Sequence, residues 1–393
     1  MSGRSTQPGT GTTVRQARVV VIGAGQAGLS SAYQLVRRGL VPHRDFVVLD
    51  ANPAPGGAWL HRWPTLTFDA AHALHSLPGF PLGTPDPQEP ASAVVNRYYG
   101  AFEQKFRLPV IRPARVLRVE PDTAASDRQE EVSAVRPTEG PLMVTTTHGT
   151  WRADVVISAT GTWDRPYWPY YPGRTGFAGQ QLHTHDYRSA EEFTGRRVLV
   201  VGAGTSAVQF LLQLAAAGAD TLWSTRRPPE FTRRPFDAEW GREVEAEVTA
   251  RTKAGLPPES VVAATGLPLT AEYQQGIDAG VLTSRGPLTR LTESSAIFAD
   301  GSEEGIDVVL WATGFRAALD HLAPLRVREP GGGIRMDGVR VVREPRLLLV
   351  GYGASASTLG ATRAGRAAAE AAVARLSDVT EGTDGERTGN LAG

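Results

Sequence analysis

Two glycine-rich turns contain the residues of this sequence with the clearest chemical potential. The first spans residues 23–28 (GAGQAG) and the second spans residues 202–207 (GAGTSA). In such a turn the first glycine permits a sharp bend and the second lets the backbone approach a diphosphate. A helix that starts there adds unpaired N–H groups and the positive end of its dipole. Each turn predicts a site for an anionic dinucleotide, and the pair predicts hydride transfer between two of them.

The elements around each turn must place it at the end of a buried strand. An apolar run precedes each turn, at 19–22 and at 198–201, and apolar residues at helical spacing follow, over 29–36 and 208–215. Only in this strand, turn and helix context does the pattern indicate dinucleotide binding. The alternative is one nucleotide-binding fold plus an ordinary glycine turn, which the repeated agreement disfavours. We expect an α/β fold with two Rossmann-like dinucleotide-binding domains.

The residues after the next strand separate the two ligands. The strand at 46–49 ends in Asp50, whose carboxylate can accept hydrogen bonds from ribose hydroxyls and repels a 2′-phosphate. The strand at 221–223 leads into Ser224, Arg226 and Arg227, and a guanidinium suits a phosphate monoester. The first site is therefore predicted to bind FAD and the second NADPH. Solvated arginines with no ligand are the open alternative at the second site.

These arguments, with the turns that follow later strands, define two predicted sets of cofactor contacts. The predicted FAD contacts are Gly23, Gly25, Gln26, Ala27, Gly28, Asp50, Gly57, Trp59, Thr160, Gly351 and Leu359. The predicted NADP contacts are Gly202, Gly204, Thr205, Ser206, Ala207, Ser224, Arg226, Arg227, Thr313 and Gly314. No metal site is expected, because His72 and His75 have no third ligand nearby.

Composition excludes several classes of function. The 393 residues carry 41 basic and 41 acidic side chains, and this balance argues against a nucleic acid or an anionic membrane as partner. There is no cysteine, so the redox-active cysteine pair of flavin disulfide reductases is excluded. The residues before position 19 lack a secretory apolar region, and no apolar run reaches the ~18 residues of a membrane span. We expect a cytoplasmic protein that acts on a small molecule.

The chain length predicts two domains in a discontinuous arrangement. We expect a disordered N-terminus over 1–16, an FAD-binding domain over 17–163 and 306–376, an inserted NADPH-binding domain over 164–305, and a disordered tail over 377–393. The proline-rich segment 166–173 predicts a stiff crossover. The strand at 308–314 is expected to return the chain to the FAD domain, and helices within 228–280 to cover the active site.

One further motif carries a resemblance to a known family. Residues 177–187 match the pattern FxGxxxHxxxY at Phe177, Gly179, His183 and Tyr187. With the two glycine turns, the GGAW segment at 56–59 and the Ala-Thr-Gly turns at 159–161 and 312–314, the chain resembles the class B flavoprotein monooxygenases over about residues 17–375. Arg188 resembles the flavin-containing monooxygenase variant of the motif, whereas Baeyer–Villiger relatives carry a tryptophan there.

The resemblance implies that NADPH would reduce FAD and that the reduced flavin would take up O2 at C4a. One oxygen atom would then pass to a small organic substrate, by N- or S-oxygenation or by Baeyer–Villiger insertion. His183 is the candidate catalytic residue, with a structural role at the domain junction as the alternative. Ala354 and Thr205 stand where relatives often carry aspartate and asparagine, and no asparagine occurs in the 60–80 region. An NADPH-dependent flavin reductase or oxidase that passes electrons to a protein acceptor or to O2, and an inactive dinucleotide sensor, remain alternatives.

Overall fold

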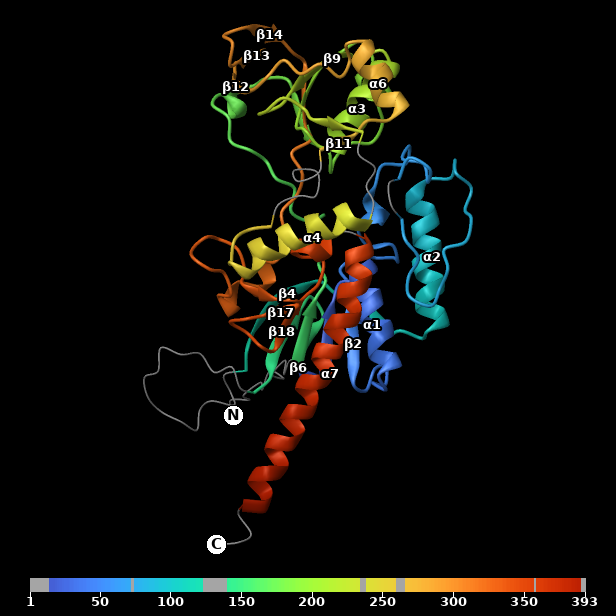
Figure 1. Ribbon diagram of the computed structural model, residues 1–393, viewed down its shortest axis with the longest axis vertical. Helices are drawn as coiled ribbons and strands as arrows, with labels where there is room; N and C mark the ends of the chain where they lie inside the picture. The colour runs from blue at the N-terminus through green and yellow to red at the C-terminus, as the bar shows by residue number, and fades with distance from the viewer. Residues whose placement is uncertain are drawn as a thin grey trace, which may run out of the picture.

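The architecture comes from a computed structural model that describes residues 14–71, 74–122, 140–233, 238–258, 266–356 and 358–389. Two units lie along the long axis of the molecule, one built on a nine-stranded sheet and one on a four-stranded sheet (Figure 1). Both units are mixed α/β structures with parallel strands at their centres, which confirms the predicted fold class.

The nine-stranded sheet places the first glycine turn. Its main path runs β16-β17-β18-β6-β1-β2-β3, with β5 pairing to β6 and β4 to β5. Strand β1 is parallel to both β2 and β6, so the turn that follows it emerges at the carboxyl end of the sheet. The strands are β1 (Val14–Ile22), β2 (Phe46–Leu49), β3 (Val110–Ile111), β4 (Val116–Pro121), β5 (Leu142–Thr146), β6 (Gly149–Ser158), β16 (Met336–Asp337), β17 (Arg340–Val341) and β18 (Leu347–Leu349).

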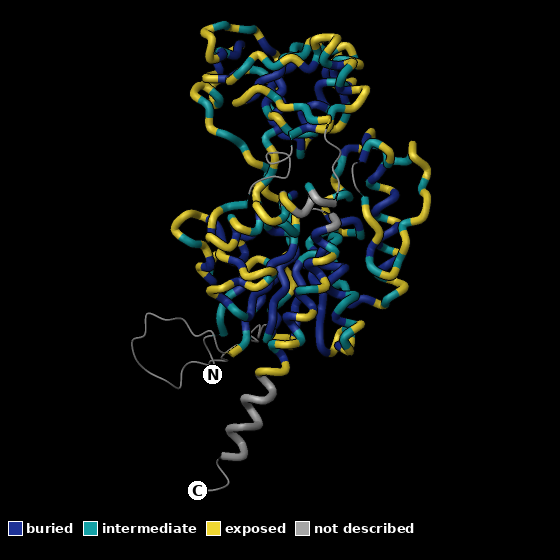
Figure 2. The backbone as a smooth tube through the Cα atoms, viewed as in Figure 1, coloured by how far each residue is buried: buried dark blue, intermediate teal, exposed yellow. Residues whose placement is uncertain are grey.

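Helices α1 (Gln26–Arg37) and α7 (Thr358–Gly389) share one hydrophobic core with this sheet, and α2 (Ala91–Lys105) contributes to the same core. Leu29 and Leu35 of α1 and Ala368 of α7 are fully buried there. A second core lies between the sheet, β4, β5 and the 3₁₀ helix η5 (Asp320–Leu325). The central strands are accordingly buried along most of their length (Figure 2).

The four-stranded sheet places the second turn. Its order is β7-β15-β8-β9 and all pairs are parallel. The strands are β7 (Gln180–His183), β8 (Arg197–Val201), β9 (Asp220–Ser224) and β15 (Val308–Trp311). Helix α3 (Thr205–Ala216) buries Val208, Leu211 and Leu214 in the core of this unit, and α6 (Ala271–Asp278) adds Tyr273. The short strands β10 (Phe231–Thr232) and β11 (Leu267–Pro268) pair beside it.

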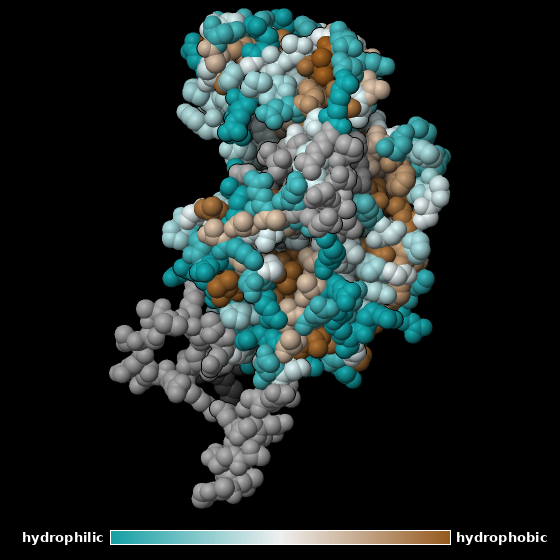
Figure 3. Space-filling view, in the orientation of Figure 1, coloured by the Kyte–Doolittle hydropathy of each residue, from teal (hydrophilic) through white to brown (hydrophobic). Residues whose placement is uncertain are grey.

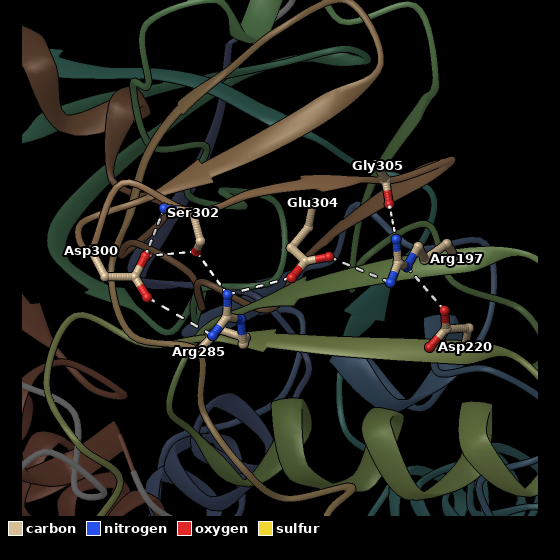
Figure 4. A network of polar contacts seen from close by, with 7 residues as sticks. All are labelled: Arg197, Asp220, Arg285, Asp300, Ser302, Glu304 and Gly305. Atoms are coloured by element: carbon tan, nitrogen blue, oxygen red, sulfur yellow. Dashed lines mark hydrogen bonds and ion pairs between the residues drawn. The ribbon is translucent and has the colours of Figure 1, made fainter.

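A three-stranded antiparallel sheet of β12 (Leu288–Leu291), β13 (Ser295–Phe298) and β14 (Glu303–Gly305) covers the four-stranded sheet. Charged residues tie the two sheets together (Figure 4). Arg197 of β8 contacts Asp220 at 2.9 Å and Glu304 at 3.4 Å, and Arg285 also contacts Glu304 at 3.4 Å. The network is partly exposed, so we expect it to fix register more than to stabilise the fold. Most of the surface visible in Figure 3 is hydrophilic, with hydrophobic residues in small separate patches.

Two crossovers between the units, at 165–167 and 314–316, run side by side. Pro166 and Phe315 form an isolated β-bridge, the N–H of Tyr167 donates to Gly314 O at 2.9 Å, and the N–H of Arg316 donates to Arg165 O at 2.8 Å. The predicted stiff linker thus gains a second strand as a partner. A paired crossover restrains the angle between the units more than a single tether would.

The strand pairing corrects the predicted boundaries at several points. Residues 14–16 belong to β1, where Val14 pairs with Thr150, so the expectation of disorder up to residue 16 is wrong there. Strand β15 lies between β7 and β8, so the prediction that it returns the chain to the first unit is wrong: it completes the parallel sheet around the second turn. Helix α7 continues to Gly389 instead of ending near 376. Residues 1–13 and 390–393 lie outside the described residues.

Helix α4 (Ala238–Lys253) is a further departure from the predicted division. It belongs in sequence to the inserted segment, yet it lies across the nine-stranded unit (Figure 1). Its Glu245 forms an ion pair with Arg363 of α7, and Thr252 packs against Gly353 in the 3₁₀ helix η6 (Gly353–Ala356). Hydrophobic spacing could not reveal this because the helix is polar along most of its length, so its docking partner depends on individual contacts.

Candidate dinucleotide sites and the junction between them

A cavity of about 510 Å³ opens at the carboxyl ends of β1 and β6. Its volume lies in the range of small-molecule and cofactor sites. Nine of the predicted FAD contacts line it: Gly23, Gly25, Gln26, Ala27, Asp50, Gly57, Trp59, Thr160 and Gly351. Tertiary structure thus brings together residues from five separate stretches of sequence.

The first glycine turn has the geometry of a diphosphate cradle. Gly23 has φ +97°, and a Cβ there would lie 2.7 Å from Ala159 O. A Cβ on Gly25, by contrast, would meet no atom within 4 Å, so this position faces the cavity. Helix α1 begins directly after Gly25, with no side chain capping it and no acidic residue in its first turn. The first turn of the helix therefore presents N–H groups and the positive end of the helix dipole, which suit an anion.

Two other predicted contacts act differently from expectation. Gly28 packs inward, since a Cβ there would lie 1.9 Å from Gly23 O, so its role is close packing of the helix on the turn. The side chain of Gln26 donates to Thr362 at 3.1 Å and accepts from Tyr99 at 3.4 Å, so these bonds hold the side chain within the protein. The side chain of Leu359 lies outside the described residues, as does His72.

Asp50 is buried at the edge of the cavity, with 3% of its surface exposed. Its Oδ2 accepts from Arg112 Nε at 2.7 Å, and Arg112 also makes two bonds of 2.7 and 2.6 Å to Glu103. The pairing compensates the cost of burying the carboxylate. Among the described residues, only Asn52 reaches Oδ1, through a long contact of 3.4 Å. Oδ1 therefore retains capacity to accept hydrogen bonds from a ribose.

The second turn repeats the geometry of the first. Gly202 has φ +147°, and a Cβ there would lie 2.1 Å from Ala312 O, while a Cβ on Gly204 would meet nothing within 4 Å. Helix α3 begins after Gly204, again with no side-chain cap and no acidic residue in its first turn. In each unit the carbonyl behind the first glycine belongs to an Ala-Thr-Gly turn, after β6 or after β15. The same cradle is built twice.

Of the predicted NADP contacts at the end of β9 and just after it, one is bonded within the protein and two are exposed to a ligand. Ser224 is buried, and its hydroxyl donates to Gly286 O at 2.9 Å and accepts from the N–H of Leu288 at 3.0 Å. These bonds hold the segment before β12 and use the donor predicted for a ligand. Arg226 and Arg227 are exposed, and neither makes an ion pair with any residue that the structure describes. Their guanidinium groups remain available for a phosphate.

Thr313 and Gly314 form hydrogen bonds with the neighbouring crossover segment. The hydroxyl of Thr313 donates to Tyr167 O, and Gly314 O accepts from the N–H of Tyr167 at 2.9 Å. Their placement at the carboxyl end of β15 is as predicted, but their polar groups are engaged by the chain itself. The predicted Thr205, Ser206 and Ala207 form the first turn of α3, where Ala207 is fully buried.

His183 lies at the end of β7 and is fully buried. Its Nε2 donates to Gly314 O at 3.0 Å, because a carbonyl can only accept, and its Nδ1 accepts from the N–H of His185 at 3.1 Å. Burial is the main cause that lowers its pKa to about 4. A neutral ring with both nitrogens engaged is unsuited to proton transfer. The geometry therefore favours the structural alternative, in which His183 ties β7 to the crossover.

Three aromatic or imidazole side chains at the cavity were missed in the sequence. His321 of η5 bonds through Nε2 to Ser158 at 3.1 Å, and His61 bonds to Asn52 at 2.7 Å. Trp163 lines the cavity and stacks on Phe315 at 5.1 Å. Each comes from a loop distant in sequence from the glycine turns, and only the position of Trp163, just after an Ala-Thr-Gly turn, could have signalled it.

The described part of the chain contains neither a membrane-spanning helix nor a cluster of metal ligands. No helix there is both long and apolar enough to span a bilayer. No group of three or more potential ligand side chains could hold a metal ion there.

Comparison with known proteins adds a family to this geometry. Residues 18–72 match the model of FAD dependent oxidoreductases, and residues 126–240 match that of pyridine nucleotide-disulphide oxidoreductases. Flavin-containing monooxygenase 5 of Rattus norvegicus is 25% identical over 348 residues, which cover 78% of this chain and 63% of that protein. The chain thus spans just under two thirds of the length of that curated relative.

Solved structures give a closer match. The flavin-containing monooxygenase from Stenotrophomonas maltophilia superposes with a TM-score of 0.74 at 34% identity, covering 92% of this chain and 100% of that one. A cyclohexanone monooxygenase shares the fold, with a TM-score of 0.63 at 18% identity. With the two cradles and the motif at 177–187, these matches show that the chain belongs to the flavin-containing monooxygenase family of class B flavoprotein monooxygenases.

Proposed function

We propose that the protein is an NADPH- and O2-dependent flavoprotein monooxygenase that inserts one oxygen atom into a small organic substrate. FAD is held by the nine-stranded unit and NADPH by the four-stranded unit. The observation that carries the proposal is the repeated cradle: two glycine turns of similar geometry, one beside a buried carboxylate and the other beside two exposed arginines that make no ion pair with the described residues. The family membership supports oxygen as the electron acceptor.

Different residues of the chain bind the two cofactors. The N–H groups at the start of α1 receive the FAD diphosphate, and Asp50 Oδ1 accepts from the ribose hydroxyls. The start of α3 receives the NADPH diphosphate, and Arg226 and Arg227 receive its 2′-phosphate. The bound flavin supplies the redox chemistry, and the protein supplies position and exclusion of water.

Several features support oxygenation over the alternatives. The chain has no cysteine, so electrons cannot pass to a disulfide of its own. The aromatic side chains Trp59 and Trp163 line the cavity and limit the access of water to a bound flavin. The placement of the protein in the cytoplasm and the identity of the substrate stay predictions. Transfer of electrons to O2 without oxygenation of a substrate is an outcome of the test below.

The test is the stoichiometry of turnover. Holoprotein with NADPH and methyl phenyl sulfide, or with a cyclic ketone, should consume one NADPH and one O2 for each sulfoxide or lactone formed, with water as the second product. NADPH oxidation that yields only hydrogen peroxide with every thioether, tertiary amine and ketone tried would refute the monooxygenase and support an oxidase. Failure of NADPH to bleach the flavin would refute both.

A further inference from the structure

Arg62 occupies an unusual place at the junction of the two units. It follows the 3₁₀ helix η1 (Gly57–His61), and three tryptophan rings surround its guanidinium. The central carbon of the guanidinium lies 4.5 Å from the ring centroid of Trp163, 5.6 Å from that of Trp59 and 6.0 Å from that of Trp63. Aromatic faces attract a cation, and the attraction grows when water is excluded.

The cation has no anionic partner within the described residues. The side chain of Arg62 makes no ion pair and no hydrogen bond with the described residues, and its Nε is enclosed without an acceptor, while its backbone N–H donates to Trp59 O at 3.1 Å. Buried arginines are rarely left in this state, since an unpaired buried charge is costly. Arg112, which is partly buried as Arg62 is, and Arg346, which is buried, each have a carboxylate partner at 2.7 Å. Burial lowers the pKa of Arg62 to about 10, so the side chain is still charged at neutral pH.

The terminal amino groups of Arg62 are accessible, whereas its Nε is enclosed. They also lack a partner within the described part of the chain, but they are not among the enclosed unpaired atoms, so they face accessible space. The rings occupy the flanks of the guanidinium and leave its outer edge for a ligand. Two parallel N–H groups at this edge match the two oxygens of a carboxylate or a phosphate.

The surroundings place this edge between the two cofactor units. Trp63 packs on Phe210 of α3 at 5.0 Å and on Tyr187 at 5.9 Å, both in the four-stranded unit. Trp163 lines the cavity of the nine-stranded unit and lies 4.9 Å from His185. A group bound by Arg62 would therefore sit where both units contribute walls. Neither glycine turn accounts for it, because each already has a helix start for its diphosphate.

We propose that Arg62 is an oxyanion-binding residue of the junction, which receives a carboxylate or phosphate group in the cage formed by Trp59, Trp63 and Trp163. Two sources share this chemistry: a carboxylate of the substrate, or a phosphate of NADPH. If the source is a carboxylate of the substrate, the proposed function extends to anionic substrates, and this part of the inference rests on that function. The oxyanion site itself stands on the cage and the unpaired charge, independently of turnover.

A binding experiment tests the site without catalysis. Purified holoprotein is titrated with sulfate and with benzoate while tryptophan emission and the unfolding midpoint are recorded, in the unchanged chain, in Arg62→Met and in Arg62→Lys. Arg62→Met keeps the apolar stem and removes the charge, and Arg62→Lys keeps the charge without the planar fork. Arg316→Gln is the matched control, because Arg316 lies 4.3 Å over the ring of Tyr167 at the same crossover but is exposed.

We expect saturable binding of sulfate or benzoate to be weakened about tenfold or more in Arg62→Met, since charge-assisted hydrogen bonds are lost. Arg62→Lys should fall between, and Arg316→Gln should bind as the unchanged protein does. Equal binding in the unchanged protein and in both Arg62 variants would overturn the proposal. So would a lack of saturable binding in the unchanged protein, provided that it retains its folded midpoint.

Two further titrations identify the source of the anion. A rise in KM for 4-(methylthio)benzoate in Arg62→Met, with the KM for neutral methyl phenyl sulfide unchanged, would assign a substrate carboxylate. A weaker Kd for NADPH, measured by anaerobic bleaching of the flavin, would assign a cofactor phosphate. If neither constant changes, the site has no role with either ligand and the proposal fails. If no substrate is oxygenated, the sulfate and benzoate titrations still decide it, so its failure is distinguishable from that of the proposed function.

Discussion

Replacing Gly204 by alanine separates binding from folding at the second cradle. Gly204 has φ −94° and ψ 172°, a conformation open to alanine, and a Cβ there would meet no atom within 4 Å. We therefore expect the folded state to be unchanged or slightly stabilised, by about 0.4–1 kcal/mol, because alanine reduces the entropy of the unfolded chain. The new methyl group would occupy the space through which the backbone approaches a diphosphate.

The cost to binding follows from the lost backbone contact. A hydrogen bond to a charged group contributes about 1.5–3 kcal/mol, so the Kd for NADPH should rise about 10- to 100-fold. FAD content should not change, since Gly25 and its cradle belong to the other unit. The assay is anaerobic bleaching of the flavin over a range of NADPH concentrations, together with the thermal midpoint.

Two other glycines complete the comparison. Gly202→Ala should destabilise the fold, because Gly202 has φ +147° and its Cβ would lie 2.1 Å from Ala312 O. Gly305→Ala in β14 is the neutral control, since it adds a Cβ in open space away from the turn. An unchanged Kd for NADPH in Gly204→Ala, or a loss of stability equal to that of Gly202→Ala, would refute the cradle.

Three more predictions follow from the same geometry. The double variant Arg226→Ala, Arg227→Ala removes both exposed guanidinium groups. It should raise the Kd for NADPH about 10- to 100-fold, while the Kd for NADH stays within about twofold. An equal rise in both Kd values would contradict the assignment of these arginines to the 2′-phosphate. His183 is neutral when folded, with a pKa of about 4 against about 6.5 unfolded, so its contribution to stability is present above pH 6.5 and is lost as the pH falls towards 4. Urea unfolding should therefore show a smaller loss between pH 7 and pH 4.5 in His183→Asn, by about 2 kcal/mol, whereas a kcat profile that shifts in this range would instead indicate proton transfer. Asp50→Asn should weaken FAD binding about 10-fold or more, measured by release of flavin fluorescence on dilution, because Arg112 loses one of its two carboxylate partners and a ribose loses a charged acceptor. Retention of FAD at the original affinity would remove Asp50 from the site.

The local patterns of the sequence predicted both cradles because each depends on neighbouring residues. Strand, turn and helix lie within about 20 residues of one another, and the positive φ of Gly23 and of Gly202 favours glycine. The absence of cysteine likewise excluded disulfide chemistry without any structure. Asp50 and Arg226 could be placed because the strand before each one ends beside its turn.

The boundaries of the units could not be predicted in this way. Strand β15 is equally apolar in either sheet, and its pairing with β7 and β8 is decided by which strand edge is open when the chain returns. Helix α4 carries too weak an apolar stripe to reveal its partner, and the ion pair of Glu245 with Arg363 joins segments far apart in sequence.

The amino-acid sequence by itself determined the two strand, glycine turn and helix units and predicted their opposite ribose preference, because short-range sterics and charge suffice for both. What only the tertiary structure decided is the junction between them. The neutral, fully engaged state of His183 and the unpaired charge of Arg62 among three tryptophans arise from contacts between distant segments. Burial and hydrogen-bond pairing depend on which distant segments meet in the folded protein. The spacing of residues along the chain therefore could not predict them.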